Sequence, residues 1–159
     1  MAEAAPAEPE RSGEGGLSLR AEDDDDLAVI SACLQDALVA VRDLAYDPAA
    51  RTFWLVANRF RWENAAGEAA TFERTLCGVA FDEIGEVAYR GFHRSEEDRI
   101  LSLLAIQTVP DAGGTVIDLE FAAGATIRLH AGAISCRARD FGEPWPTTWQ
   151  PDHERGAPQ

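Results

Sequence analysis

Apolar and polar residues alternate most clearly in the stretch RTFWLVANRFRWE, from Arg51 to Glu63. From Phe53 onwards the even positions are apolar except at Asn58, whereas the odd positions change from apolar to charged at Arg59. The apolar even residues are Trp54, Val56, Phe60 and Trp62. Because successive side chains of a strand point to opposite faces, we predict a strand whose even face is buried and whose odd face emerges into water.

Before this strand, the pattern predicts a short edge strand over Leu17 to Arg20 and then a helix from about Asp24 to Asp36. Apolar residues recur there at helical spacing, at Leu27, Ile30, Leu34 and Leu38. The acidic run 22–26 stands at the expected helix start, where negative charge complements the helix dipole. We therefore interpret the acids as a helix N-terminus rather than as calcium ligands, which need spaced oxygens and usually a turn glycine.

The rest of the pattern is mainly that of strands joined by short turns. The expected hairpins join 38–46 to 51–63, 72–81 to 86–92, and 115–121 to 126–130. The segment from Arg99 to Pro110 is apolar on both parities, which fits either a strand covered on both faces or a buried helical turn. Ile134, Ala138 and Phe141 recur at helical spacing before Gly142, so we predict a short C-terminal helix.

These elements predict an α+β domain with a mainly antiparallel twisted sheet or partly open barrel of about seven strands. An N-terminal helix and a short C-terminal helix complete it, an element count that is similar to the pleckstrin-homology fold. We expect one domain over 17–149, a disordered acidic tail over 1–16, where Ala, Pro, Glu and Gly dominate, and a polar tail over 150–159.

Charge and composition narrow the class of protein. Residues 1–26 carry nine acids and two arginines, which is half of the net charge of −14. Nucleic-acid binding through phosphate neutralisation is therefore disfavoured. No apolar run reaches a bilayer span and the start of the chain is acidic, so we expect no membrane association and a cytoplasmic location. The three cysteines, Cys33, Cys77 and Cys136, are expected to be reduced packing residues.

Four segments of the chain are similar to a family of bacterial proteins: LAVISACLQDALVAVRDLAY, NRFRWE, ILSLLAI and GATIRL. Through them, roughly Leu17 to Trp145 resembles the uncharacterised proteobacterial family catalogued as domain of unknown function 2948. The family's pattern has more basic residues near Arg99 and along 74–90, where this chain is more acidic and Ala-rich. The resemblance implies a small cytoplasmic bacterial protein and carries no activity.

Arginines and large aromatics form the best candidate contact surface. The candidate binding residues are Arg59, Arg61, Trp62, Arg74, Arg128 and Trp145. These residue types are enriched at binding hot spots, although aromatics in a central strand also form cores, with arginine stems covering them. We therefore expect either a core strand or a surface for a protein partner or a second copy. The alternative is a pocket in which Arg59, Arg128 and a carboxylate hold a small anionic metabolite.

No catalytic, metal or cofactor site is predicted. His130 and Cys136 would serve as base and nucleophile only if they met in space, and a packed cysteine is the competing interpretation. His93 with the acids 96–98 offers ligand types for a divalent metal, or else a solvated face or helix start. We find no P-loop, dinucleotide fingerprint or nucleophile elbow, so the sequence leans towards a non-enzymatic, protein-binding or self-assembling module.

Overall fold

The computed structural model describes residues 16–65 and 72–147, which form an antiparallel sheet of ten strands and one α-helix. The first strand β1 (Ser18–Ala21) leads into α1 (Asp24–Cys33). The helix begins where the Asp23 side chain accepts a hydrogen bond from the Asp26 backbone N–H at 2.8 Å, and acids fill its first turn. The predicted edge strand, helix and helix start are thus confirmed.

The remaining elements are strands and short 3₁₀ turns. They are β2 (Leu38–Ala40), β3 (Leu44–Asp47), β4 (Thr52–Phe60), β5 (Glu73–Phe81), β6 (Ile84–Arg90), β7 (Ile100–Asp111), β8 (Gly114–Phe121), β9 (Thr126–Ala131) and β10 (Cys136–Pro146). Turns of 3₁₀ type lie at Val41–Asp43, Trp62–Asn64 and Ala122–Gly124.

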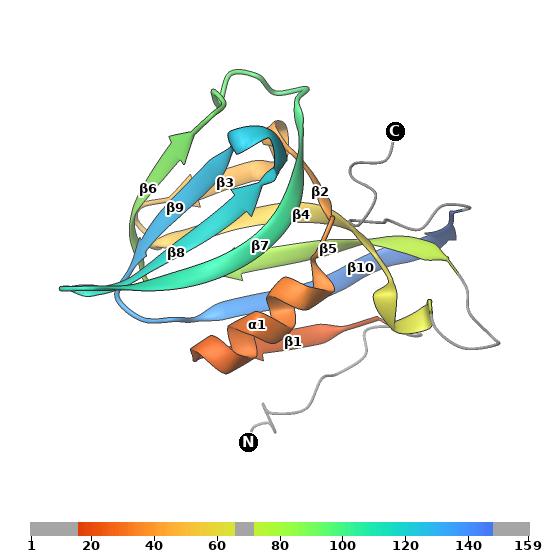
Figure 1. Ribbon diagram of the computed structural model, residues 1–159, viewed down its shortest axis with the longest axis horizontal. Helices are drawn as coiled ribbons and strands as arrows, with labels where there is room; N and C mark the ends of the chain where they lie inside the picture. The colour runs from red at the N-terminus through yellow and green to blue at the C-terminus, as the bar shows by residue number, and fades with distance from the viewer. Residues whose placement is uncertain (1–15, 66–71, 148–159) are drawn as a thin grey trace.

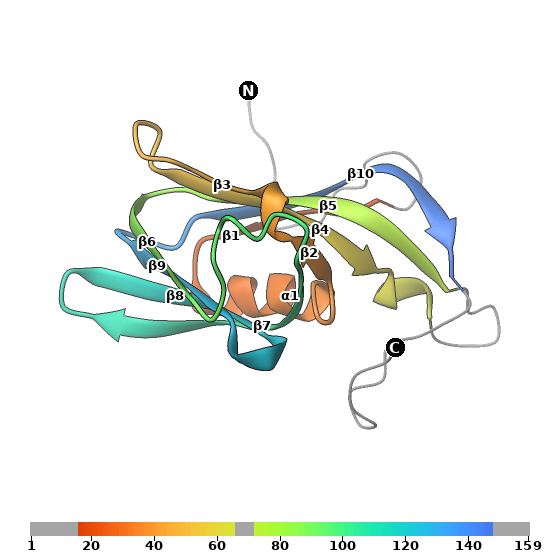
Figure 2. The same ribbon diagram turned by 90° about the horizontal axis from the view of Figure 1, so that it is seen from above.

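The strand order is β1-β10-β5-β4-β2-β7-β8-β9-β6, with β3 paired to β4 beside β2. The two layers meet at β2, which pairs with β4 on one side and with β7 on the other. β1, β10, β5, β4 and β3 form one layer and β7, β8, β9 and β6 the other (Figure 1). Seen from above, α1 lies between the two layers (Figure 2). One side chain bridges the edge strands β3 and β6, because the Tyr46 hydroxyl donates to the Ile84 backbone carbonyl at 2.7 Å.

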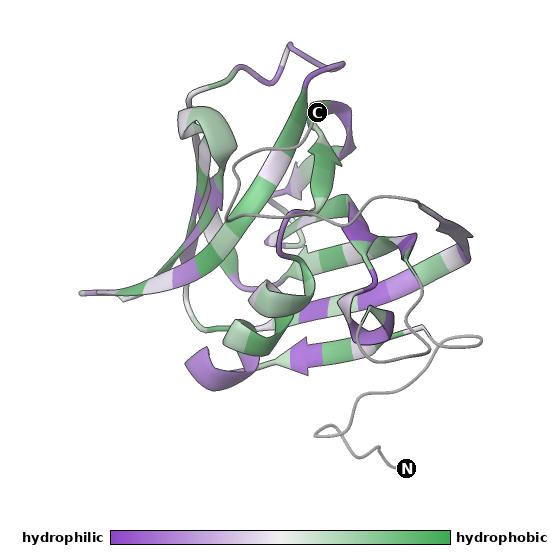
Figure 3. Cartoon of the chain, turned by 45° about the vertical axis from the view of Figure 1, so that its right-hand side comes forward, coloured by the Kyte–Doolittle hydropathy of each residue, from purple (hydrophilic) through white to green (hydrophobic). Residues whose placement is uncertain are grey.

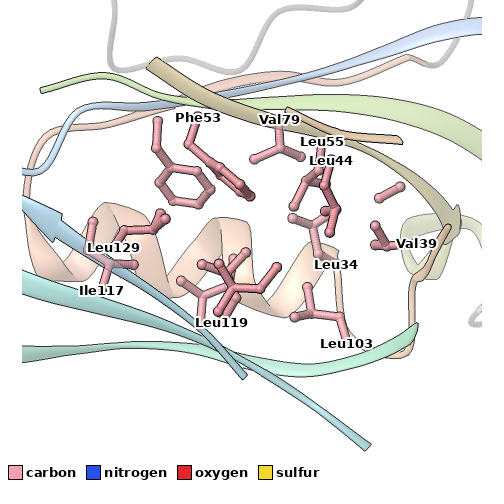
Figure 4. Packing of buried hydrophobic residues seen from close by; sticks show 14 of the residues in the cluster. Leu34, Val39, Leu44, Phe53, Leu55, Val79, Leu103, Ile117, Leu119 and Leu129 are labelled. Carbon is pink, nitrogen blue, oxygen red and sulfur yellow. The ribbon is translucent and has the colours of Figure 1, made fainter. Parts of the chain in front are cut away.

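The core lies between the layers and is made of inward-facing aliphatic and aromatic side chains from both. Phe53, Leu55 and Val79 face Ile117, Leu119 and Leu129 across it, with Leu34, the residue after α1, alongside (Figure 4). Hydrophobic and hydrophilic residues alternate along several strands, as expected when one face is buried and the other meets water (Figure 3).

Two hairpins are confirmed and one is wrong. β3 pairs with β4, and β8 pairs with β9 so that Ile117 lies opposite Leu129. β5 and β6 are adjacent in sequence but do not pair, because β5 lies between β4 and β10 while β6 pairs with β9. The short connection therefore carries the chain from one layer to the other.

The prediction of seven strands and a closing helix is also wrong. Residues 136–146 form β10, whose inward residues Cys136, Ala138 and Asp140 alternate with exposed Arg137 and Arg139. The helical spacing misled because Phe141 lies on the opposite face from Ala138.

The likeness to the pleckstrin-homology fold is not confirmed, because that fold closes with a helix where this chain continues its sheet. The ambiguous segment before Pro110 is a strand, β7. The tails expected over 1–16 and 150–159 lie outside the described residues except for Gly16.

Candidate functional site

Arg59 lies in a buried ion cluster at the end of β4, and not in solvent. Its side chain is 1% exposed. Nε and one terminal nitrogen donate to the two oxygens of Asp140 in β10, at 2.8 and 2.7 Å. The terminal nitrogens also donate to the two oxygens of Glu63, at 3.1 and 2.7 Å. A last bond reaches the Phe60 carbonyl at 3.2 Å, so these contacts use all five N–H donors of the guanidinium.

The electrostatics of this cluster are those of a structural ion group. Burial opposes the charge of Arg59, but hydrogen bonds to Asp140 and Glu63 outweigh it and raise its pKa. Burial likewise disfavours the charged form of Glu63, yet the hydrogen bonds and charge of Arg59 hold the pKa of its carboxyl below the usual value. Asp140 also accepts from the Leu17 backbone N–H at 2.9 Å, so the cluster joins β10, β4 and the start of β1.

The neighbouring candidates are held in the same part of the fold. Arg61 is 5% exposed and donates to Glu73 at 2.6 Å. Trp62 begins a 3₁₀ turn, with its ring edge on Phe60 and its indole N–H donating to the Gln35 carbonyl at 3.2 Å. Arg74 is 7% exposed and donates to the side-chain and backbone oxygens of Asn58 at 2.6 and 2.9 Å.

The two faces of β4 are therefore the reverse of the prediction from Phe53 to Arg59, whereas the even residue Phe60 is buried as predicted. The odd residues Phe53 and Leu55 are buried, while the even residue Trp54 is 40% exposed. The prediction failed because it treated Arg59 as a mark of the solvent face, whereas Asp140 and Glu63 supply enough carboxylates to neutralise an inward arginine. The expectation that Arg59 and Arg61 reach solvent is wrong.

The even residues of β4 instead open onto a surface that we name the aromatic–arginine face. It comprises Trp54, Val56, Leu76, Gly78, Ala80, Phe141, Arg137, Arg139 and Arg20. The register places Trp54 beside Ala80, Arg137 and Arg20 in one row across β4, β5, β10 and β1. Phe141 is 47% exposed, and its ring edge lies 4.0 Å from where a side chain on Gly78 would begin.

Arginines surround these exposed rings. Arg137 donates to Asp82 at 3.2 Å, with half of its side chain exposed. Among the described residues, Arg20 and Arg139 are exposed and make no side-chain hydrogen bond or ion pair. Trp145, a predicted binding residue, is 38% exposed. It lies opposite Arg74 in the ladder between β10 and β5, near one end of this face.

Arg128 lies elsewhere, on the outer face of β9. It donates to both oxygens of Asp118 in β8 at 2.8 Å each and lines a cleft of about 360 Å³. Arg59 does not line this cleft, so the expected pocket that combines Arg59 with Arg128 is not formed there.

The cysteines are free thiols, and two of the three are fully buried. Burial raises the pKa of Cys136 to about 12, so this thiol is protonated at neutral pH. His130 lies with the outward residues of β9, whereas Cys136 faces the core. Within residues 16–65 and 72–147, no group of three or more His, Cys, Asp or Glu side chains is placed to hold a metal ion.

Sequence reasoning missed Phe141, Arg137, Arg139 and Asp140 as members of either region. Their signal is the alternation in CRARDF, which becomes visible once Asp140 is accepted as an inward residue. Asp118 was missed for a different reason. It lies on the outward face of β8, where an acid is ordinary, although its side chain is only 7% exposed.

No helix in the described part of the chain is both long and apolar enough to cross a membrane. No curated protein and no solved structure matches the chain. A family described as "Protein of unknown function (DUF2948)" matches residues 17–153, which include every described strand and the helix. The chain therefore belongs to the DUF2948 family, as the resemblance of its four segments indicates.

Proposed function

We propose that this domain is a protein-binding module that docks an acidic protein partner on the aromatic–arginine face. The observation that carries the proposal is the exposure of Trp54 and Phe141, at 40% and 47%, on the outward side of a regular sheet. Two large exposed aromatics on one face of a sheet indicate an interaction surface more than an ordinary monomer surface.

The chemistry of the face supports a protein ligand. Trp and Arg are the residue types most enriched at binding hot spots, because they bury a large area while keeping directed donors. Gly78 leaves a shallow place beside the Phe141 ring, where an apolar group of the partner is able to pack. The sheet backbone beneath is held by ladders on both sides of β5, so the surface is rigid before binding.

The charges favour an acidic partner over a second copy of this chain. Arg20 and Arg139 present guanidinium groups that no described residue engages. A two-fold dimer through this face would bring the arginines of both copies together, which opposes association. Single-stranded nucleic acid also stacks on aromatic faces, but it needs a positively charged groove that follows its backbone, whereas this face is the outer side of a sheet.

Site-specific photo-crosslinking in the native host tests the proposal. A photoreactive residue at position 56 lies on the face, and one at position 90 lies on the other layer as a control. We expect a protein to crosslink from position 56 and not from position 90. That protein is then purified and its dissociation constant for the domain measured.

The charge-reversed pair Arg137→Glu with Arg139→Glu should weaken binding of the purified partner at least about thirtyfold, equivalent to roughly 2 kcal/mol. The matched pair Arg42→Glu with Arg90→Glu makes the same change of charge at exposed positions off the face and should leave binding within about threefold. Equal losses in both pairs, a homodimer joined through position 56, or crosslinking only to nucleic acid would overturn the proposal.

A further inference from the structure

A second surface, in the other layer of the molecule, has the form of a small-molecule site. The cleft of about 360 Å³ lies on the outer side of β6, β9 and β8. It shares no residue with the aromatic–arginine face. Its volume is near the lower end of the range for ligand pockets, which suits a ligand of amino-acid size.

The cleft exists because short side chains stand among long ones. In one row across β6, β9 and β8, Arg128 lies between Ala88 and Asp118. In the next row, Arg90 and Glu120 lie on either side of Thr126. Ala88 and Thr126 therefore form a low floor between arginine and glutamate side chains that rise around it.

Arg128 is already oriented for a ligand. Its Nε and one terminal nitrogen donate to the two oxygens of Asp118, which is 7% exposed. Both carboxylate oxygens are thereby occupied, while the second terminal nitrogen of Arg128 keeps two N–H donors. A buried carboxylate that fixes a half-exposed guanidinium reduces the entropy lost when an anion binds.

Arg90 and Glu120 supply unpaired charges of opposite sign on opposite sides. Neither forms an ion pair among the described residues. They are separated by β9, and since adjacent strands lie about 4.8 Å apart, their backbones are about 10 Å from each other. Thr126 adds a hydroxyl between them.

The balance of charge selects the ligand class. Arg90 and Arg128 are offset by Asp118 and Glu120, and Asp111 acts on Arg128 as a further negative charge. A dianion such as phosphate would meet no net positive charge there. We propose that the cleft binds a small zwitterion, a free α-amino acid. Its carboxylate lies on Arg90 and Arg128, and its ammonium group on Glu120.

Ligand-observed NMR titration with L-alanine tests this proposal against probes that each lack one charge. L-alanine should bind saturably in the millimolar range, whereas propionate, ethylammonium and inorganic phosphate should bind at least tenfold more weakly. Arg90→Gln and Glu120→Gln should each weaken L-alanine binding about tenfold or more. Both are solvent-side changes without described partners, so thermal melts should be unchanged and show that the variants are folded.

Arg51→Gln is the matched control, because Arg51 is likewise an exposed arginine without a described side-chain hydrogen bond or ion pair, and it lies in the turn before β4, outside both surfaces. It should leave L-alanine binding unchanged. Propionate or phosphate binding as tightly as L-alanine would overturn the zwitterion assignment. Absence of saturable L-alanine binding, or equal binding by Arg90→Gln and the natural chain, would overturn the site. Photo-crosslinking at position 56 is independent of either result.

Discussion

The two faces of strand β4 use the same residue types for opposite purposes. On the inward face, Arg59 is enclosed by Asp140 and Glu63 and every donor is used. On the outward face, Trp54 stands in a row with Arg137 and Arg20, and much of their surface meets water. The comparison teaches that an arginine beside aromatic residues indicates a contact surface only when its N–H donors have no partners within the protein. Where nearby carboxylates accept from all of these donors, the arginine has a structural role.

The largest effect should come from the inward arginine. Arg59→Leu removes the buried arginine that Asp140 and Glu63 share and leaves Glu63 only the longer contact with Arg61 at 3.7 Å. The free energy of unfolding should therefore fall by about 3 to 5 kcal/mol. Arg139→Leu, on the outward face, should change it by no more than about 0.5 kcal/mol. Urea denaturation of both variants measures the difference.

Replacing Asp140 and Glu63 together with Arg59 tests whether the loss comes from uncompensated charge. Combining Arg59→Leu with Asp140→Leu and Glu63→Gln should recover much of the loss, because a well-packed apolar replacement of a buried ion pair is often neutral. A triple variant as unstable as Arg59→Leu alone would mean that the cluster stabilises the fold by its shape rather than by charge compensation.

Adjacent apolar residues of β4 give the second contrast. Leu55→Ala should cost about 3 kcal/mol, because Leu55 is 2% exposed and the truncation leaves a cavity in the core. Val56→Ala, on the outward face, should cost about 1 kcal/mol or less. Thermal melts that rank the two in reverse order would restore the face assignment predicted from sequence.

The pH dependence of stability gives the third contrast. The folded-state pKa of Glu63 lies below its unfolded value, so its contribution is fully present above the ordinary value of about 4.3 and is lost as pH falls through the folded pKa. The natural chain should therefore lose stability on acidification in this window. Glu63→Gln should be less stable at neutral pH and show a shallower loss, which denaturation at a series of pH values measures.

The smallest effect should come from Gly78. A Cβ at this position would have its nearest neighbours at 4.0 Å, which is ordinary contact. Gly78→Ala should raise the free energy of unfolding by about 0.5 to 1 kcal/mol, because glycine in a strand interior costs backbone entropy. The same methyl group should weaken partner binding slightly by filling the shallow place beside Phe141. A loss of stability would contradict the available space.

Local patterns were sufficient to predict the elements whose signals agree. The acids after Asp23 begin α1, and Ile117 and Leu119 pair across a hairpin with residues of matching alternation. The sequence misled where one residue broke the pattern. Asp140 at an inward position hid strand β10, and Arg59 reversed the faces of β4, because each is acceptable inside only with the other present. Their separation of 81 residues places that pairing beyond any local window.

The hydrogen bond between the Leu17 backbone N–H and the Asp140 carboxylate spans 123 residues. During synthesis it forms only after Asp140 has been added to the nascent chain. A ribosome releases β1, α1, β4 and β5 well before it makes Asp140. Until then Arg59 has only Glu63 as a described acidic partner, and the side of β5 that later joins β10 stays open. Native assembly of this layer must therefore wait until β10 has left the exit tunnel. Slow release of β10 prolongs an intermediate with an unpaired sheet edge, the form most exposed to misassociation and to chaperones.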